Sequence, residues 1–200
     1  MQVSKPIKVA IFASGSGTNA QRIIDYFKEN AGVEIALILS NNPDAYVLTR
    51  AKEASIPIRV FTKAEFKDST IIVDELITAG ISWVVLAGFL WLVPKSLIQA
   101  FPTSILNIHP ALLPNFGGKG MYGMYVHKAV IETGAKETGI TIHKVNEEYD
   151  KGEIVFQSRF EVLATDTPET VAEKIHALEY AHFPLVIEEQ IHKSLQNSYI

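Results

Sequence analysis

The sequence contains no cysteine. Disulfide bonds, thiolate metal sites and thioester chemistry are therefore excluded. No apolar run reaches membrane-spanning length and the first residues do not form an apolar signal segment, so we expect a cytoplasmic protein that does not enter a membrane. Basic residues do not outnumber acidic ones in this sequence. The 18 Lys+Arg against 22 Asp+Glu give a formal net charge of −4, which disfavours nucleic acid as the main ligand.

The 200 residues, of which 48% are hydrophobic, are enough for one domain with a sizeable core. Strand and helix patterns alternate through the first half, beginning with an apolar strand at 8–13 and a helix at 20–30. In the second half, two alternating segments at 139–145 and 154–160 flank a turn and predict an antiparallel pair. We therefore predict a doubly wound α/β protein, with a mostly parallel sheet and an antiparallel strand pair in its C-terminal half.

The last predicted helix has a clear start. Thr167 is suited to cap it, Pro168 fits its first position, and an acid follows in the first turn. Pro184 lies within the same helix and is expected to kink or divide it.

A glycine-rich turn, residues 15–20 (GSGTNA), joins the first strand to the first helix. Its exposed amides and the helix N-terminus favour an anion, most often phosphate. A dinucleotide site would also need an acid at the end of the second strand, where this chain has Asn41 and Asn42. Hydroxyl and amide side chains in the turn instead suit a terminal phosphate monoester. The alternative is a tight turn that needs glycine for structural reasons only.

Two apolar runs, 84–94 and 105–114, carry polar groups where a buried strand ends. Asn107 and His109 are two residues apart, so their side chains point to the same side of an extended segment, and Pro110 ends that strand. Open α/β folds place their sites at such strand ends. Carboxamide and imidazolium N–H groups can both donate to the oxyanion of an acyl transfer. The alternative is a structural histidine bonded beneath the proline turn.

Asp150 lies in the turn between the two alternating segments. A carboxylate near His109 would favour the protonated imidazole and could relay protons through water, although a turn residue is the simpler interpretation.

The remaining histidines lack metal-ligand spacing, so no metal is expected. His143 would at most support the site, and the other histidines would lie on the surface or in the packed interior. Glu179, on the last helix, is expected on the solvated surface by default. No G-x-S-x-G elbow supports a serine acyl-enzyme.

Four segments together resemble the phosphoribosylglycinamide formyltransferase family, the folate-dependent enzymes of de novo purine synthesis. They are residues 14–19 (SGSGTN), 85–89 (VLAGF), 106–114 (LNIHPALLP) and 150–157 (DKGEIVFQ). The resemblance extends from the first strand to about Ile187. It implies a Rossmann-like formyltransferase fold for residues 1–200, with a phosphate-binding half at about 1–80 and a folate and catalytic half at about 81–200. Small-molecule substrates and a monomer or homodimer are also implied.

The resemblance implies that the amine of N1-(5-phosphoribosyl)glycinamide attacks the formyl carbon of the co-substrate 10-formyltetrahydrofolate. Transfer would be direct, between oriented substrates and without an enzyme-bound intermediate. Asn107 and His109 would stabilise the oxyanion, and His109 would help to deliver a proton to the departing folate nitrogen. Asp150 would keep His109 charged and order a water molecule.

The resemblance also implies two sets of binding residues. Those that match the phosphoribosylglycinamide site are Ser16, Gly17, Thr18, Asn19, Pro110 and Glu179. Those that match the folate site are Leu90, Trp91, Leu92, Val93, Asn107, Glu148 and Tyr149.

Two segments depart from the family pattern. Trp91 stands where many members carry arginine, which affects local specificity more than main-chain recognition of the pterin. Residues 116–125 are longer and richer in glycine than the usual connection, and we expect them to form a mobile lid, with Lys119 as a candidate contact to phosphate or glutamate. The cation for the folate tail is not evident; Lys63 and Lys67 are candidates.

Other functions share parts of this pattern. Formyltetrahydrofolate hydrolase has the same three catalytic residues, which match Asn107, His109 and Asp150 here, and transfers the formyl group to water. It normally carries an additional N-terminal domain, which we do not expect here. Methionyl-tRNA formyltransferase adds a tRNA-binding domain and a basic surface, which this sequence does not suggest. The non-enzymatic alternative is a domain that binds a phosphate ligand through residues 15–20 alone.

Overall fold

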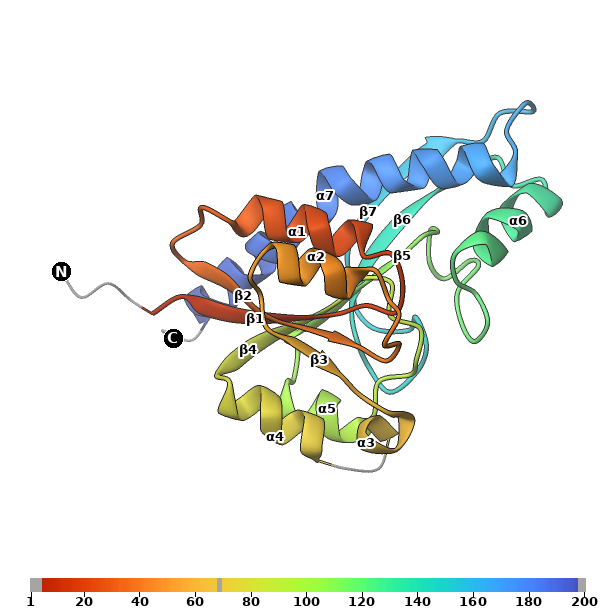
Figure 1. Ribbon diagram of the computed structural model, residues 1–200. Coiled ribbons are helices and arrows are strands. Elements are labelled where there is room, and N and C mark those ends of the chain that lie inside the picture. The colour runs from red at the N-terminus through yellow and green to blue at the C-terminus, as the bar shows by residue number, and fades with distance from the viewer. Residues whose placement is uncertain (1–4, 68–69, 198–200) are drawn as a thin grey trace. The chain divides into compact units, whose positions relative to one another are not determined.

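The computed structural model describes residues 5–67 and 70–197 (Figure 1). The chain divides into two compact units, with the division between Leu106 and Asn107. The expectation that both halves form one formyltransferase domain stays a prediction. Within the described residues, no helix combines the length and apolar character needed to cross a membrane.

The first unit is built on four parallel strands: β1 (Ile7–Phe12), β2 (Val33–Ser40), β3 (Ile58–Val60) and β4 (Ile81–Leu86). Their order is β3-β2-β1-β4, so β1 pairs with β2 on one side and with β4 on the other. Residues 9–12 of β1 are completely inaccessible to solvent. An apolar strand that is buried on both faces is typical of a parallel sheet covered by helices.

Five helices accompany these strands: α1 (Thr18–Phe27), α2 (Val47–Glu53), α3 (Lys63–Lys67), α4 (Ile71–Thr78) and α5 (Lys95–Ala100). Figure 1 shows α1 and α2 on one face of this sheet and α3, α4 and α5 on the other. The inward stripe of α1 consists of Ala20, Ile23, Ile24 and Phe27, all of them buried. The parallel strands with helices on both faces confirm the predicted doubly wound α/β arrangement.

The second unit contains the end of β5 (Ile105–His109), β6 (Glu137–Lys144) and β7 (Ile154–Glu161), in the order β5-β6-β7. The antiparallel register of β6 and β7 confirms the predicted pair. Two helices, α6 (Met124–Glu132) and α7 (Pro168–Asn197), pack against each other, and α7 also packs on β6.

The start of α7 agrees with its sequence signals. Pro168 is its first residue, and the N–H of Thr170 donates to Oγ1 of Thr167 over 3.3 Å. The helix continues through Pro184 as one element, so the proline does not divide it, and the kink that was the other expectation stays a prediction. A proline removes one hydrogen bond from the helix, and the packing of α7 on β6 and α6 outweighs that loss.

Gly139 marks a close approach of the two antiparallel strands. A Cβ atom at this position would lie 1.9 Å from the carbonyl oxygen of Ser158 and 2.8 Å from the Cα atom of Arg159. Because both neighbours are backbone atoms, β7 would have to move as a whole to make room. The sheet therefore needs glycine here.

We expect Gly139→Ala to lower the free energy of unfolding by about 3 kcal/mol, at the upper end of the usual cost of overpacking. Gly32→Ala is the matched control, because its nearest contact would be an ordinary 3.4 Å to Oδ1 of Asn30; it should change stability by less than ~0.5 kcal/mol. Urea denaturation measures both. Equal stabilities of the two variants would show that the strands do not approach as described.

Candidate functional site

Asn107 and His109 lie two residues apart on β5, as predicted, and Pro110 follows at the end of that strand. The side chain of Asn107 is half-buried, and His109 is only 3% exposed. A buried imidazole has few ways to satisfy both of its nitrogen atoms, so its partners define its chemistry.

The turn between β6 and β7 brings Asp150 to these residues. Its Oδ2 lies 3.6 Å from Nδ1 of His109, and its Oδ1 lies 3.7 Å from Nε2 of His143. Oδ2 also accepts a hydrogen bond of 2.9 Å from the N–H of Gly118. The backbone of Asp150 is left-handed, with φ of 55°, a conformation that aspartate tolerates better than most residues. The structure thus places all three predicted catalytic side chains together within the second unit.

His143 has a larger part in this arrangement than the sequence suggested. Its Nδ1 lies 2.9 Å from the carbonyl oxygen of Lys144, which can only accept, so Nδ1 carries the hydrogen. Nε2 of the neutral ring is then an acceptor, and Nδ2 of Asn107 donates to it over 3.0 Å. His143 therefore fixes which way the carboxamide of Asn107 points. The signal in the sequence was the position of His143 near the end of an alternating strand.

The charge state of His109 differs from the expectation. Burial lowers its pKa below 6.5, and this outweighs the opposite effects of the Asp150 carboxylate and of the Phe116 carbonyl oxygen. Nε2 lies 2.8 Å from that carbonyl oxygen and donates to it. His109 is accordingly neutral near pH 7, with its hydrogen on Nε2. Asp150 does favour the charged imidazole, but not strongly enough to overcome burial.

Asp150 itself remains a carboxylate. Burial alone would raise its pKa, but the hydrogen-bond and charge interactions that His143 and His109 make with it in their protonated forms, together with the N–H of Gly118, lower it below the usual 3.8. A buried negative charge next to a neutral imidazole stabilises a positive charge that develops on that ring during a reaction.

A second set of hydrogen bonds holds the backbone that follows Pro110. The buried hydroxyl of Thr141 donates to the carbonyl oxygen of Ala111 over 2.7 Å and accepts from the N–H of Leu113 over 3.0 Å. Nε2 of Gln157 donates to Oγ1 of Thr141 over 2.9 Å and to the Leu113 carbonyl over 3.0 Å. β6 and β7 therefore fix the path of the chain between His109 and the glycine-rich segment.

The glycine-rich segment 116–125 begins at this cluster, through the carbonyl of Phe116 and the N–H of Gly118. Further along, Tyr122 and Tyr125 meet edge to face, with ring centroids 5.3 Å apart, and both are exposed, as is Lys119. The lid movement expected for this segment stays a prediction.

In the first unit, the turn at residues 15–20 has the geometry of an anion site. Gly17 precedes α1 in the left-handed region, with φ of 70°, and no side chain caps that helix. A Cβ atom on Gly17 would lie 2.5 Å from Cβ of Val47, and the N–H of Val47 donates to the Gly15 carbonyl over 3.2 Å. The turn therefore rests on the start of α2, with the uncapped N-terminus of α1 available to an anion.

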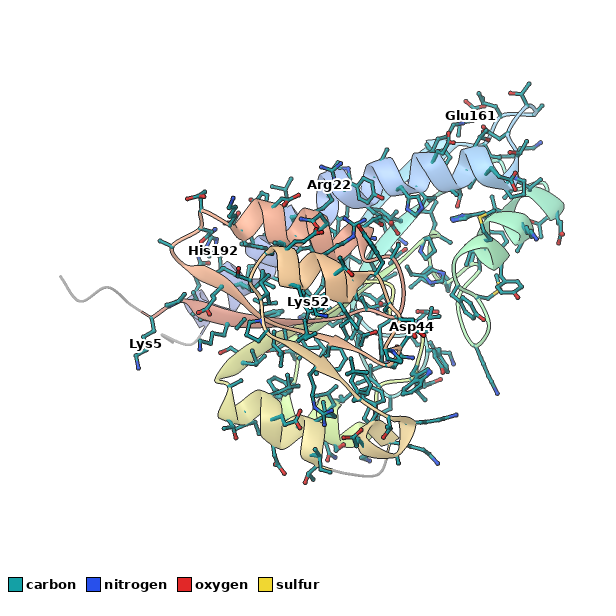
Figure 2. All side chains as sticks on the ribbon, viewed as in Figure 1. Lys5, Arg22, Asp44, Lys52, Glu161 and His192 are labelled. Carbon is teal, nitrogen blue, oxygen red and sulfur yellow. The ribbon has the colours of Figure 1, made fainter. Side chains whose placement is uncertain are left out.

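The turn after β2 lacks a carboxylate in the place of a ribose-binding acid. Asn41 and Asn42 follow the strand, and Oδ1 of Asn42 accepts from the N–H of Asp44 over 3.0 Å. The side chain of Asp44 itself is exposed (Figure 2). This agrees with the expectation that residues 15–20 suit a phosphate monoester rather than a dinucleotide, and that binding stays a prediction.

Comparison with known proteins gives a consistent result. The formyl transferase family model matches residues 7–187. A Bacillus subtilis protein named phosphoribosylglycinamide formyltransferase is 36% identical over 189 residues, which are 91% of this chain and 93% of that protein. The crystal structure of a phosphoribosylglycinamide formyltransferase from Bacillus halodurans has a TM-score of 0.83 at 37% identity and covers 94% of this chain and 96% of its own. The chain belongs to the formyl transferase family.

A longer relative is a chloroplastic phosphoribosylglycinamide formyltransferase of Arabidopsis thaliana, 44% identical over 194 residues. The match covers 92% of this chain, which spans 66% of the plant protein's length. Membership in the formyl transferase family confirms the predicted resemblance, the enzyme class and formyltetrahydrofolate as the co-substrate. Among the described residues, no group of three histidines or acids could hold a metal ion.

Some of the residues expected to contact the folate lie in the first unit, where Leu90 and Leu92 are 44% and 43% exposed, whereas Val93 is buried. The N–H of Leu90 donates to Oγ of Ser14 over 3.2 Å. In the second unit, the side chain of Glu148 is exposed and pairs with Lys151, while Tyr149 is half-buried.

Trp91, which stands where many family members carry arginine, belongs to an aromatic cluster. Its ring centroid lies 6.0 Å from that of Phe61, 5.9 Å from that of Phe66 and 6.2 Å from that of Phe89. The indole is held by these rings, so it rigidifies the segment after β4 instead of offering a charge.

Glu179 is buried, with 5% exposure, so the default expectation of a solvated position is wrong. Its Oε2 accepts from Nδ1 of His176 over 3.1 Å, and the ring of His176 stacks on Tyr180. The hydrogen bond to Glu179 raises the pKa of His176 above 6.5. A buried acidic side chain that pairs with His176 is consistent with the ribose-binding role implied by the family.

A cavity of about 620 Å³ lies in the first unit among α1, α2 and the start of β2. None of the predicted site residues lines it. Volume therefore does not identify the site, which is recognised by its hydrogen bonds and charges.

The pKa of His176 leads to a prediction about stability. Because the folded state holds a proton there that the unfolded chain loses at about pH 6.5, the His176–Glu179 pair stabilises the fold below that pH and loses its effect as the pH rises through the raised pKa. We expect His176→Gln to lower the free energy of unfolding more at about pH 6 than at about pH 8.5.

Urea denaturation at both pH values measures this difference. His192→Gln removes an exposed histidine from the same helix and is the control (Figure 2). A larger destabilisation at the higher pH would contradict the assignment.

Proposed function

We propose that this chain transfers the formyl group of 10-formyltetrahydrofolate to the amine of N1-(5-phosphoribosyl)glycinamide, by direct attack through a tetrahedral oxyanion. The observation that carries the proposal is the catalytic cluster, which we define as Asn107, His109, His143 and Asp150. Successive members lie within 3.0 to 3.7 Å of one another inside the second unit. Such a cluster combines oxyanion donors with a buried charge, as acyl transfer requires.

In the proposed reaction, the amine nitrogen forms a bond to the formyl carbon, and the carbonyl π electrons move onto oxygen. Collapse of this tetrahedral intermediate breaks the bond between the formyl carbon and N10 of the folate. The amine loses one proton, N10 gains one, and the products are the formylated amide and tetrahydrofolate. No external oxidant or reductant is needed, and the protein supplies orientation, hydrogen bonds and a proton route.

Asn107 and His109 would stabilise the oxyanion. One hydrogen of the Asn107 carboxamide is held by His143, which leaves the other to point at a ligand. The Nε2–H of His109 donates a hydrogen bond to the Phe116 carbonyl oxygen. When the beginning of the glycine-rich segment moves, this N–H would donate its hydrogen bond to the oxyanion instead. The lid expected at residues 116–125 would therefore control when His109 becomes available.

Asp150 would act through His109. Since burial keeps the imidazole neutral at rest with its hydrogen on Nε2, Nδ1 on the Asp150 side can accept the proton of the attacking amine through a water molecule held by Asp150, and the adjacent carboxylate then stabilises the imidazolium. That imidazolium would deliver its proton to N10, directly or through a water molecule held by Asp150. The role differs from the expected one, in which His109 was charged from the start.

The binding roles follow the family pattern. Residues Ser16, Gly17, Thr18 and Asn19 would bind the substrate phosphate, supported by the left-handed Gly17 and the uncapped N-terminus of α1. Pro110 and Glu179 would contact the rest of the phosphoribosylglycinamide. Leu90–Val93, Glu148 and Tyr149 would contact the folate. We further propose a cytoplasmic monomer or homodimer that binds neither nucleic acid nor membrane, in agreement with a net charge of −4.

The direct test mixes the protein with 10-formyltetrahydrofolate, with and without N1-(5-phosphoribosyl)glycinamide, and follows the deformylated folate. We expect release only when the amine is present. Release that ignores the amine would identify a hydrolase, which uses the same trio with water as the acceptor. No release in either mixture would show that the proposed reaction is wrong.

Removing one oxyanion donor should be costly. We expect Asn107→Ala to lower kcat by about a hundredfold or more, because a preorganised donor that acts on the developing charge cannot be replaced by water. Asn107→Asp keeps the size of the side chain but replaces the donor with a negative charge, and it should lower kcat further. Steady-state transfer assays measure both, and a change of less than about threefold in each would remove Asn107 from the mechanism.

A further inference from the structure

Arg50, on α2, is attached to the turn at residues 15–20. Its Nε–H donates to the carbonyl oxygen of Ser16 over 2.8 Å, and its Nη1 lies 3.4 Å from Oε1 of Gln21 on α1. One half-buried side chain thus bonds both to the turn and to the helix that follows it. Charge-assisted bonds of this kind are among the stronger ones in proteins.

The guanidinium group of Arg50 is itself held in place. Its Cζ lies 4.9 Å from the centroid of the Tyr46 ring, one helical turn earlier. No carboxylate of the described part of the chain lies within ion-pair distance of it, so its positive charge is not neutralised by the protein. A cation that stacks on an aromatic face loses little further freedom when it forms a hydrogen bond.

α2 therefore holds the turn at three points. The N–H of Val47 bonds to the carbonyl of Gly15, the side chain of Val47 fills the space below Gly17, and Arg50 bonds to the carbonyl of Ser16. When Arg50 and Val47 hold these two carbonyl groups on the α2 side, the amides of the same peptide units are left to face the ligand.

We propose that Arg50 is a positioning residue for phosphate recognition. It orients the peptide after Ser16 and places an unneutralised positive charge behind the turn. This inference rests on the proposed function of residues 15–20 and extends it to a residue outside the turn. It predicts an effect on one substrate only, since the hydrogen bonds of Arg50 go to Ser16 in the turn and to Gln21 on the helix that follows it.

We expect Arg50→Met to raise the KM for N1-(5-phosphoribosyl)glycinamide by about tenfold, the effect of losing one charge-assisted bond. The value of kcat and the KM for 10-formyltetrahydrofolate should change by less than about twofold, because the transition-state groups are untouched. Steady-state kinetics with each substrate varied in turn measures all three constants. A merely structural role would change them together.

Two further variants serve as controls. Arg50→Lys keeps the charge and one donor, and it should restore most of the affinity lost in Arg50→Met. Lys52→Met removes a positive charge from an exposed position of the same helix (Figure 2), and it should leave every constant unchanged. If Lys52→Met raised the KM as much as Arg50→Met, general electrostatics would explain the effect and the inference would be wrong.

Gly17→Ala separates this inference from the proposed function. A side chain there would be strained at φ of 70° and would collide with Val47, so the turn itself would be distorted. If Gly17→Ala raises the KM for the phosphoribosyl substrate and Arg50→Met does not, the positioning role fails and the phosphate site stands. If neither variant raises it, residues 15–20 do not bind the phosphate and both proposals fall.

Discussion

The second unit depends on one buried charge. The carboxylate of Asp150 is 12% exposed, and burying an ionised group costs several kcal/mol unless polar partners compensate. The N–H of Gly118 donates a hydrogen bond to this carboxylate over 2.9 Å, and the rings of His109 and His143 lie 3.6 and 3.7 Å away, each with a nitrogen that carries no hydrogen toward it. They come from β5, β6 and the glycine-rich segment, so the charge fixes the relative placement of three separate parts of this unit. Because the negative charge of Asp150 is incompletely paired, it can stabilise a positive charge that develops on His109 during the reaction.

The histidines show how one fold sets different charge states. Burial lowers the pKa of His109 and of His127, whereas a hydrogen bond to Glu179 raises that of the more exposed His176. A neutral His109 can accept a proton in the first step of a transfer and return it in the second. A permanently charged one could only donate. The burial of β5 is thus part of the proposed chemistry as well as of the packing.

Much of this could be predicted from the sequence, because local patterns carried it. The period of the apolar residues predicted the parallel strands, the glycines at 15 and 17 predicted the turn before α1, and the Asn107/His109 spacing predicted two polar residues on one strand. The features that the sequence did not predict depend on contacts between residues that are distant in the sequence. The link from His143 to Asn107 depends on the pairing of distant segments, and Glu179 is buried because α7 packs on β6 and α6. A sequence also shows the acid that neighbours His109 but not the depth of burial that lowers the pKa of the ring.

The most direct test of the central claim replaces the charge of Asp150 and keeps its shape. In Asp150→Asn, the side-chain oxygen can still accept from Gly118, while the stabilisation of a charged His109 is lost. Single-turnover formyl transfer, measured with both substrates saturating, should be slower by about a hundredfold or more, with both substrates still bound. A rate within about threefold of the unsubstituted protein would show that the buried charge does not drive the reaction.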